Sequence, residues 1–153
     1  MTVMRKTLAT AVLLGALVAP LYAHADPCKL ELTGNDEMQY DRHDLWVNGA
    51  CTEVTLTLRH TGKLPKEAMG HNWVLVNAKD LDAVANAGMA AGLQNNYVAP
   101  DDKRVLAHTK VVGGGETTSV TFSTSILQKG GAYKYLCTFP GHHALMQGTF
   151  KFG

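Results

Sequence analysis

The stretch T-E-V-T-L-T-L-R, residues 52–59, alternates apolar and polar side chains with a period of two. Val54, Leu56 and Leu58 point one way, and the residues between them carry hydroxyl or charged groups. This alternation is typical of a β-strand that buries one face and exposes the other. The stretch therefore predicts a half-buried strand that needs a second layer to cover its apolar face.

Similar strands recur along the chain. Leu30 and Leu32 alternate with polar neighbours near the start, and H-N-W-V-L-V (71–76) is more fully apolar. The other expected strands are 105–112, T-S-V-T-F-S (118–123), A-Y-K-Y-L-C (132–137) and T-F-K-F (149–152). Short, regularly punctuated strands predict an all-β fold, a Greek-key antiparallel β-sandwich.

One segment departs from the period of two. Residues 78–93 are rich in alanine, and Leu81, Val84 and Met89 are spaced about one or two helical turns apart. Alanine is the residue with the highest helix propensity. The segment predicts one short helical insertion between strands, interrupted at Gly88.

The N-terminus reads as a secretory signal. Arg5 and Lys6 precede an apolar run over residues 8–19, and Ala23-His24-Ala25 supplies small residues where a signal peptidase cuts. Cleavage after Ala25 leaves residues 26–153, 128 of the 153 residues, which suit a single domain located outside the cytoplasm.

The charge of this mature segment is close to neutral. Removing Arg5 and Lys6 from the 14 Lys and Arg residues leaves 12 against 13 Asp and Glu residues, a net charge of −1. No apolar run in the mature segment is long enough to span a bilayer. We therefore expect no nucleic-acid partner and no membrane association, and we expect a monomer.

Three cysteines remain in the mature segment, an odd number for an exported protein. Cys28 and Cys51 flank the first expected strands, whereas Cys137 lies far along the chain. The economical division is a Cys28–Cys51 disulfide and one thiol kept for chemistry. A spare thiol in an oxidising compartment is a liability unless it is sequestered or bound, which favours a ligand role for Cys137.

The stretch C-T-F-P-G-H-H-A-L-M, residues 137–146, contains several side chains that can bind a soft metal ion. Cys137, His142 and Met146 can converge if the loop folds back after Pro140-Gly141, and His71 is the best candidate for a fourth ligand. Two imidazoles, one thiolate and a weak thioether are typical of blue-copper electron-transfer sites. Zinc is the alternative, but methionine is a poor zinc ligand.

Five stretches resemble the azurin family, bacterial periplasmic cupredoxins with type 1 (blue) copper. They are G-N-D-x-M-Q (34–39), M-G-H-N-W-V-L (69–75), P-D-D-x-R-V (100–105), A-H-T-K (107–110) and C-T-F-P-G-H-x-A-L-M (137–146). The resemblance runs from Cys28 to Phe152, and the disulfide and the helical insertion fit it too. It implies a cupredoxin fold, one copper ion per chain and the function of an electron carrier.

The resemblance also implies roles for individual residues. The implied copper ligands are His71, Cys137 and His142 in one plane, with Met146 and the Gly70 backbone carbonyl as weak axial ligands. Asn72 and the Phe139 backbone N–H would donate to the thiolate and tune the reduction potential. His142 is selected over its neighbour His143, which replaces a small polar residue common in this family and is expected to face solvent.

An exposed apolar patch for brief docking is the last feature that the resemblance implies. Its expected members are Leu64, Pro65, Met69, Phe139, Pro140, Ala144 and Leu145. The expected partners are periplasmic redox proteins such as c-type cytochromes or a copper reductase. His60 matches a shielded position that is not a ligand, His108 is expected at the surface, and Trp73 is expected in the core.

Two other functions compete with electron transfer. A copper enzyme needs a second copper centre or an open coordination position, and no additional histidine cluster in the sequence can build one. A copper-delivery protein favours exposed, exchangeable ligands, whereas these ligands are expected inside a sandwich. The sequence therefore predicts a protein that is not an enzyme and moves electrons between respiratory partners.

Overall fold

The computed structural model describes residues 26–153. The expected signal peptide, residues 1–25, lies outside the described residues. Of the described residues, no helix is both long enough and apolar enough to cross a membrane.

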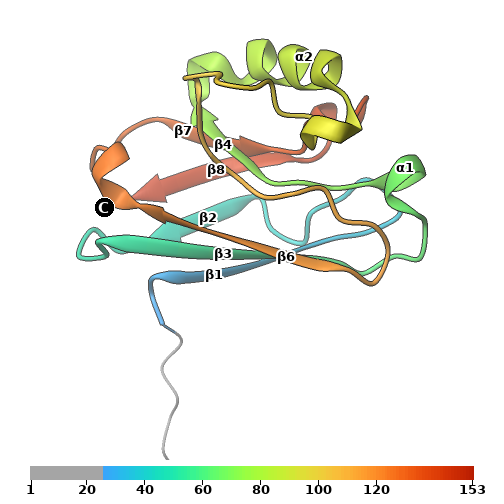
Figure 1. Ribbon diagram of the computed structural model, residues 1–153. Helices are drawn as coiled ribbons and strands as arrows, with labels where there is room; N and C mark the ends of the chain where they lie inside the picture. The colour runs from blue at the N-terminus through green and yellow to red at the C-terminus, as the bar shows by residue number, and fades with distance from the viewer. Residues whose placement is uncertain (1–25) are drawn as a thin grey trace, which may run out of the picture.

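Two β-sheets pack face to face (Figure 1). The first has the strand order β1-β3-β6, with β1 at Lys29–Gly34, β3 at Glu53–His60 and β6 at Thr117–Ser123. The second has the order β2-β8-β7-β4-β5, with β2 at Asp44–Val47, β8 at Gln147–Phe152, β7 at Tyr133–Leu136, β4 at Val74–Asn77 and β5 at Val105–His108. The predicted all-β sandwich is confirmed.

The core between the sheets follows from the alternation in the sequence. Val54, Leu56 and Leu58 of β3 are fully buried, while the residues between them face outward. Trp73 and Phe150 meet them from the second sheet, both with no exposed surface. The predicted inward residues therefore form one contiguous apolar core.

The strand directions require a correction, because the sheets are not wholly antiparallel. β1 pairs with β3 in parallel, with Leu30 opposite Leu56, and β2 pairs with β8 in parallel. The chain passes from β1 to β2 in the other sheet and then returns to β3. Two crossings reverse the chain direction twice, so β3 runs the same way as β1. Alternation fixes which face a side chain occupies but carries no information on the direction of the neighbouring strand.

The predicted helical insertion covers the outer face of the second sheet (Figure 1). It contains helix α2 (Leu81–Ala91), preceded by the 3₁₀ turn η1 (Ala78–Asp80) and followed by η2 (Leu93–Asn95). Leu81, Val84 and Ala85 of α2 are buried against Val74 and Val76 of β4. This packing explains why β4 is apolar on both faces.

The expected interruption at Gly88 is wrong, because α2 continues through this residue to Ala91. A Cβ atom at Gly88 would collide with the Tyr97 carbonyl oxygen and would approach the Thr138 Cβ to 3.0 Å. Glycine is required here for close packing rather than as a helix stop.

Three short helical turns were not predicted: α1 (Lys66–Met69), η3 (Thr124–Ile126) and η4 (His142–Ala144). Each spans only three or four residues, too few to show a period. In Figure 1, α1 lies at the end of the sandwich opposite the C-terminus. It ends immediately before Gly70 and His71.

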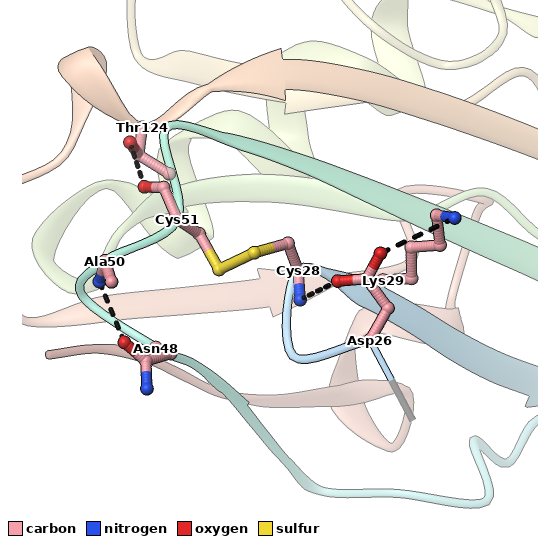
Figure 2. The surroundings of a disulfide bond; sticks show 7 residues. All are labelled: Asp26, Cys28, Lys29, Asn48, Ala50, Cys51 and Thr124. Atoms are coloured by element: carbon pink, nitrogen blue, oxygen red, sulfur yellow. Dashed lines mark hydrogen bonds and ion pairs between the residues drawn. A yellow bond between two sulfur atoms is a disulfide. The ribbon is translucent and has the colours of Figure 1, made fainter. Parts of the chain in front are cut away.

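The predicted disulfide is confirmed (Figure 2). Cys28 and Cys51 form the bond, with their Cα atoms 5.7 Å apart. The Thr124 hydroxyl donates to the Cys51 carbonyl oxygen at 2.7 Å, which ties the bridge to the turn after β6. The bond therefore joins the starts of β1 and β3.

Candidate metal centre

Two loops at one end of the sandwich carry the soft ligands. His71 precedes β4 and is anchored by paired backbone hydrogen bonds with Val112, at 2.9 and 2.8 Å. Cys137 follows β7, and its N–H donates to the Met146 carbonyl oxygen at 2.9 Å. The Met146 N–H in turn donates to the His142 carbonyl oxygen at 2.8 Å. The second loop is therefore folded back on itself, as the Pro-Gly turn predicts.

The structure brings His71, Cys137 and His142 together. One nitrogen from each imidazole and the cysteine sulfur all lie within 4.8 Å of one another. The Cys137 Sγ is 3.7 Å from the His142 Nδ1. His71 and Cys137 are 0% exposed and His142 is 3% exposed, so only His142 reaches the molecular surface.

The tautomer of His71 leaves one ring nitrogen free to act as a ligand. Its Nε2 lies 2.7 Å from the Asn35 carbonyl oxygen, which can only accept, so Nε2 carries the hydrogen. Its Nδ1 is buried and has no hydrogen-bond partner among the described residues. A buried lone pair without a partner is costly unless it binds something. This nitrogen, beside a thiol and a second imidazole, fits a copper ion.

The two groups expected as weak axial ligands lie near the three donors. The Gly70 carbonyl oxygen is 4.0 Å from the Cys137 Sγ. Gly70 must lack a side chain, because a Cβ there would collide with the Lys66 carbonyl oxygen and with Val111. Met146 is fully buried, and its methyl group and the His71 ring both border the same glycine, Gly34. The axial candidates therefore border the cluster formed by the three donors.

Two opposing effects act on the pKa of the Cys137 thiol. Burial raises its pKa to about 11, because the charged thiolate loses its solvation. The backbone N–H groups of Asn72 and Phe139 point at the sulfur and lower the pKa, as does the Tyr40 hydroxyl. Donors that stabilise the thiolate are placed to draw charge from a copper–sulfur bond.

The Asn72 side chain connects three segments. Its Oδ1 accepts from the Thr138 N–H at 2.9 Å, and its Nδ2 donates to the Thr138 hydroxyl at 2.7 Å and to the Asn96 carbonyl oxygen at 2.8 Å. Thr138 also donates from its hydroxyl to the Tyr97 carbonyl oxygen at 2.7 Å. The segment after α2 therefore buttresses the residue next to Cys137.

The imidazoles are kept neutral by burial. Desolvation lowers the pKa of His142 to about 4 and also lowers the pKa of His71. His60 stacks on His71 with ring centroids 4.3 Å apart. Its Nδ1 accepts from the Gly62 N–H at 3.0 Å and its Nε2 donates to the Met69 carbonyl oxygen at 2.8 Å. His60 is 1% exposed, so the expectation that it is shielded agrees with the structure.

Most members of the expected apolar patch are exposed. Leu145 is 57% and Leu64 is 42% exposed, and Met69 is half-buried. The other exposed members are Pro65, Pro140 and Ala144. The expectation that Phe139 is exposed is wrong, because its ring is 7% exposed and packs between Tyr97 and His142.

The remaining histidines and tryptophans can also be placed. His143 is half-buried rather than solvent-facing, its Nδ1 is covered, and it lies outside the donor cluster. His108 is exposed on β5 and Trp73 is fully buried, both as expected. Trp46, which carried no signal, is 55% exposed on β2.

Three contributors to the site were not found from the sequence. Asn35 acts through its backbone oxygen, which leaves no side-chain signal, although it lies in the G-N-D stretch. Thr138 sits inside the C-T-F-P-G-H stretch and was not assigned a role. Tyr40 directly follows the G-N-D-x-M-Q stretch, and neither period nor motif draws attention to it.

Comparisons with known proteins agree with this geometry. Residues 26–153 match the copper binding proteins of the plastocyanin/azurin family. Azurin-1 of Alcaligenes xylosoxydans xylosoxydans is 55% identical over 124 residues, covering 81% of this chain and 96% of that protein. The azurin of Pseudomonas aeruginosa is 49% identical over 146 residues, covering 95% of this chain and 97% of that protein.

A solved structure shares the fold as well. The azurin Az-iso2 from the obligate methylotroph Methylomonas sp. strain J superposes with a TM-score of 0.80 at 46% identity, covering 82% of this chain and 98% of that chain. These matches span the two ligand-bearing loops and the sandwich that holds them. The chain therefore belongs to the plastocyanin/azurin family of copper-binding proteins and is a copper electron-transfer protein.

Proposed function

We propose that this protein is a periplasmic one-electron carrier with a mononuclear type 1 copper site. His71, Cys137 and His142 would be the equatorial ligands, and Met146 and the Gly70 carbonyl oxygen the weak axial ones. Copper held there would supply reversible one-electron chemistry between Cu(I) and Cu(II). The observation that carries the proposal is the buried, unpartnered His71 Nδ1 facing a buried thiol and a second imidazole.

Enclosure of the donors supports a carrier rather than an enzyme. His71 and Cys137 have no exposed surface, and His142 exposes only 3% of its surface. A substrate molecule has no approach to the donor atoms. An electron needs only a short covalent and packed path, which the His142 ring provides to the surface. Burial also argues against a copper-delivery protein, because a metal that is handed on needs accessible ligands.

The surface around His142 supports brief docking. Five apolar residues of the segments flanking the candidate ligands are exposed, and Met69 is half-buried. We propose that the five together form one surface, which we call the docking patch: Leu64, Pro65, Pro140, Ala144 and Leu145. A small apolar contact gives weak, short-lived complexes. Such contacts suit rapid turnover with redox proteins such as c-type cytochromes or a copper reductase. We propose that the protein meets them as a monomer.

The sequence supports export. The signal pattern over residues 1–25 and the Cys28–Cys51 disulfide both fit an oxidising compartment outside the cytoplasm. Residues 26–153 would then be the mature, single-domain protein. Mass spectrometry of the protein purified from periplasmic extract should give a chain that begins at Asp26.

The colour of the copper-loaded protein tests the site. We expect one copper per chain and intense blue absorption from thiolate-to-copper charge transfer, which disappears on reduction and returns on reoxidation. Cys137→Ser should abolish the blue band, and His143→Ser, its matched control in the same loop, should keep it. Colourless copper binding would refute the type 1 assignment. Loss of copper to a competing protein on reduction would favour delivery instead.

A further inference from the structure

Tyr40 is a buried polar residue beside the metal centre, and the function described so far does not use it. It lies between β1 and β2, is 3% exposed, and forms an isolated bridge with Gly34. Its hydroxyl donates to the Asn72 carbonyl oxygen at 2.5 Å. A tyrosine in a core needs such a partner, because an unpaired hydroxyl is costly to bury.

The partner of Tyr40 links the two loops that carry the candidate ligands. Asn72 follows His71, directs its backbone N–H at the Cys137 sulfur, and accepts the Thr138 N–H on its side chain at 2.9 Å. The Tyr40 hydroxyl also lowers the pKa of the Cys137 thiol. Its proton is donated to the Asn72 carbonyl oxygen, between the two ligand-bearing loops.

We propose that Tyr40 is a positioning residue whose hydroxyl tunes the copper–thiolate bond through Asn72, and so raises the reduction potential. This inference rests on the proposed function. A donor near the sulfur draws negative charge from it and favours the reduced state, which carries one more electron. Removing the hydroxyl leaves the ring in place but leaves the Asn72 carbonyl oxygen without this donor.

A second buried tyrosine provides a control that distinguishes an effect on the reduction potential from an effect on core packing. Tyr135 is fully buried, its ring centroid is 5.7 Å from that of Tyr40, and its hydroxyl donates to the Arg42 carbonyl oxygen at 2.6 Å. It shares with Tyr40 the ring, the burial and the carbonyl partner. It differs in that its partner is not next to a candidate ligand. Tyr135→Phe is therefore the matched control for Tyr40→Phe.

The experiment compares copper-loaded wild type, Tyr40→Phe and Tyr135→Phe in equilibrium with one reference redox couple. At a fixed ambient potential, we expect the reduced-to-oxidised ratio to fall about fivefold in Tyr40→Phe, the size of one hydrogen bond. Tyr135→Phe should change the ratio by less than about 1.5-fold, because a distant neutral hydroxyl contributes little at the sulfur. The copper–sulfur stretching bands in resonance Raman spectra should shift in Tyr40→Phe alone.

A third substitution changes the strength of the Tyr40 hydrogen bond without removing the hydroxyl, so it tests the inference with little effect on protein stability. Replacing Tyr40 by 3-fluorotyrosine keeps the ring and makes the hydroxyl a stronger donor, so the reduced-to-oxidised ratio should rise above that of the wild type. The inference would be overturned if Tyr40→Phe and Tyr135→Phe changed the reduced-to-oxidised ratio equally. It would also be overturned if 3-fluorotyrosine left this ratio unchanged. A blue wild type with these outcomes would leave the proposed function standing. A wild type that binds no copper would overturn the proposed function and this inference with it.

Discussion

The hydrogen bond from His71 Nε2 to the Asn35 carbonyl oxygen determines the chemistry of a single ring. Because the carbonyl fixes the hydrogen on Nε2, the lone pair of Nδ1 must face Cys137 and His142. The same contact turns the edge of the ring away from solvent. Within residues 26–153, the His142 ring has no hydrogen bond to a carbonyl oxygen, and it keeps a small exposed fraction. The two imidazoles therefore differ in role: one is fixed inside the protein and one leads outward.

A charge placed on the docking patch should change the rate of electron exchange with a redox partner. Leu145→Glu places a carboxylate on its most exposed large residue and should slow electron exchange with a c-type cytochrome at least several-fold, with the blue absorption unchanged. Trp46→Glu is the matched control, because Trp46 is 55% exposed against 57% for Leu145 but lies on β2. Stopped-flow mixing measures both rates. Equal slowing by the two variants would contradict a local docking patch.

The histidine pKa values predict how the metal-free protein responds to acid. The pKa of His142 is lowered from 6.5 to about 4 and that of His71 is also lowered, so the unfolded chain binds protons that the folded protein does not. Stability is therefore full above about pH 6.5 and is lost as the pH falls toward about 4. Between pH 7.5 and pH 5 we expect His142 to account for about 1–2 kcal/mol.

Urea unfolding of the metal-free protein at the two pH values measures this loss. His142→Gln should have a smaller difference between pH 7.5 and pH 5 than the wild type. His108→Gln, which changes an exposed histidine, should keep the full difference. A pH dependence that is unaffected by His142→Gln would show that another group is responsible.

At the scale of elements, α2 and the segment after it support the site as well as the core. Leu81 and Val84 bury one face of the helix on β4, and the turn that follows presents the Asn96 and Tyr97 carbonyl oxygens to Asn72 and Thr138. Both Asn96 and Tyr97 have positive φ values, 54° and 52°. This conformation is unfavourable for a tyrosine, and the hydrogen bonds to the ligand-bearing loops offset its cost.

Gly88→Ala tests that support. In an exposed helix this change stabilises by up to about 1 kcal/mol, but here the new Cβ would collide with the Tyr97 carbonyl oxygen. We expect a loss of about 1–3 kcal/mol in the free energy of unfolding and a shifted blue absorption band, because Thr138 must move. Asn86→Ala on the exposed face should be neutral or slightly stabilising. A stabilising Gly88→Ala would disprove the close contact.

The sequence predicted the individual strands and the helix better than it predicted how strands pair and which distant residues touch. The period of two located β3 and the composition located α2, because both depend on neighbours along the chain. The parallel pairing of β1 with β3 could not be predicted, because direction depends on how the chain crosses between sheets. The chemistry of Cys137 and His142 was visible in one loop. Tyr40 was missed because its role depends on contact with Asn72, 32 residues away.

In the whole molecule, the starts of β1 and β3, which the disulfide joins, lie at the end of the sandwich opposite α1, the helix that directly precedes Gly70 and His71 (Figure 1). Cys51 precedes β3, and His60, the last residue of β3, stacks on His71. The eight residues of β3 extend about 26 Å at the usual rise of a strand. Changes at one end should therefore leave the other end undisturbed while the fold persists.

Removing the disulfide tests this independence. Cys28→Ser with Cys51→Ser opens a loop of sequence separation 23 and should lower the free energy of unfolding by about 3 kcal/mol. The blue absorption and the reduction potential should match those of the wild type. Denaturant unfolding and a redox titration measure the two quantities. A changed potential would show that strain is transmitted along β3.

The deep burial of Cys137 has a consequence for the time between folding and copper binding. With a pKa of about 11, only about one thiol in 10⁴ is ionised at pH 7, and none of its surface is accessible. Oxidants react with the thiolate, and a thiolate is also what attacks a foreign disulfide, so we expect the folded, metal-free protein to oxidise slowly. Copper binding would displace the proton. The protein could thus fold first and take up its metal later.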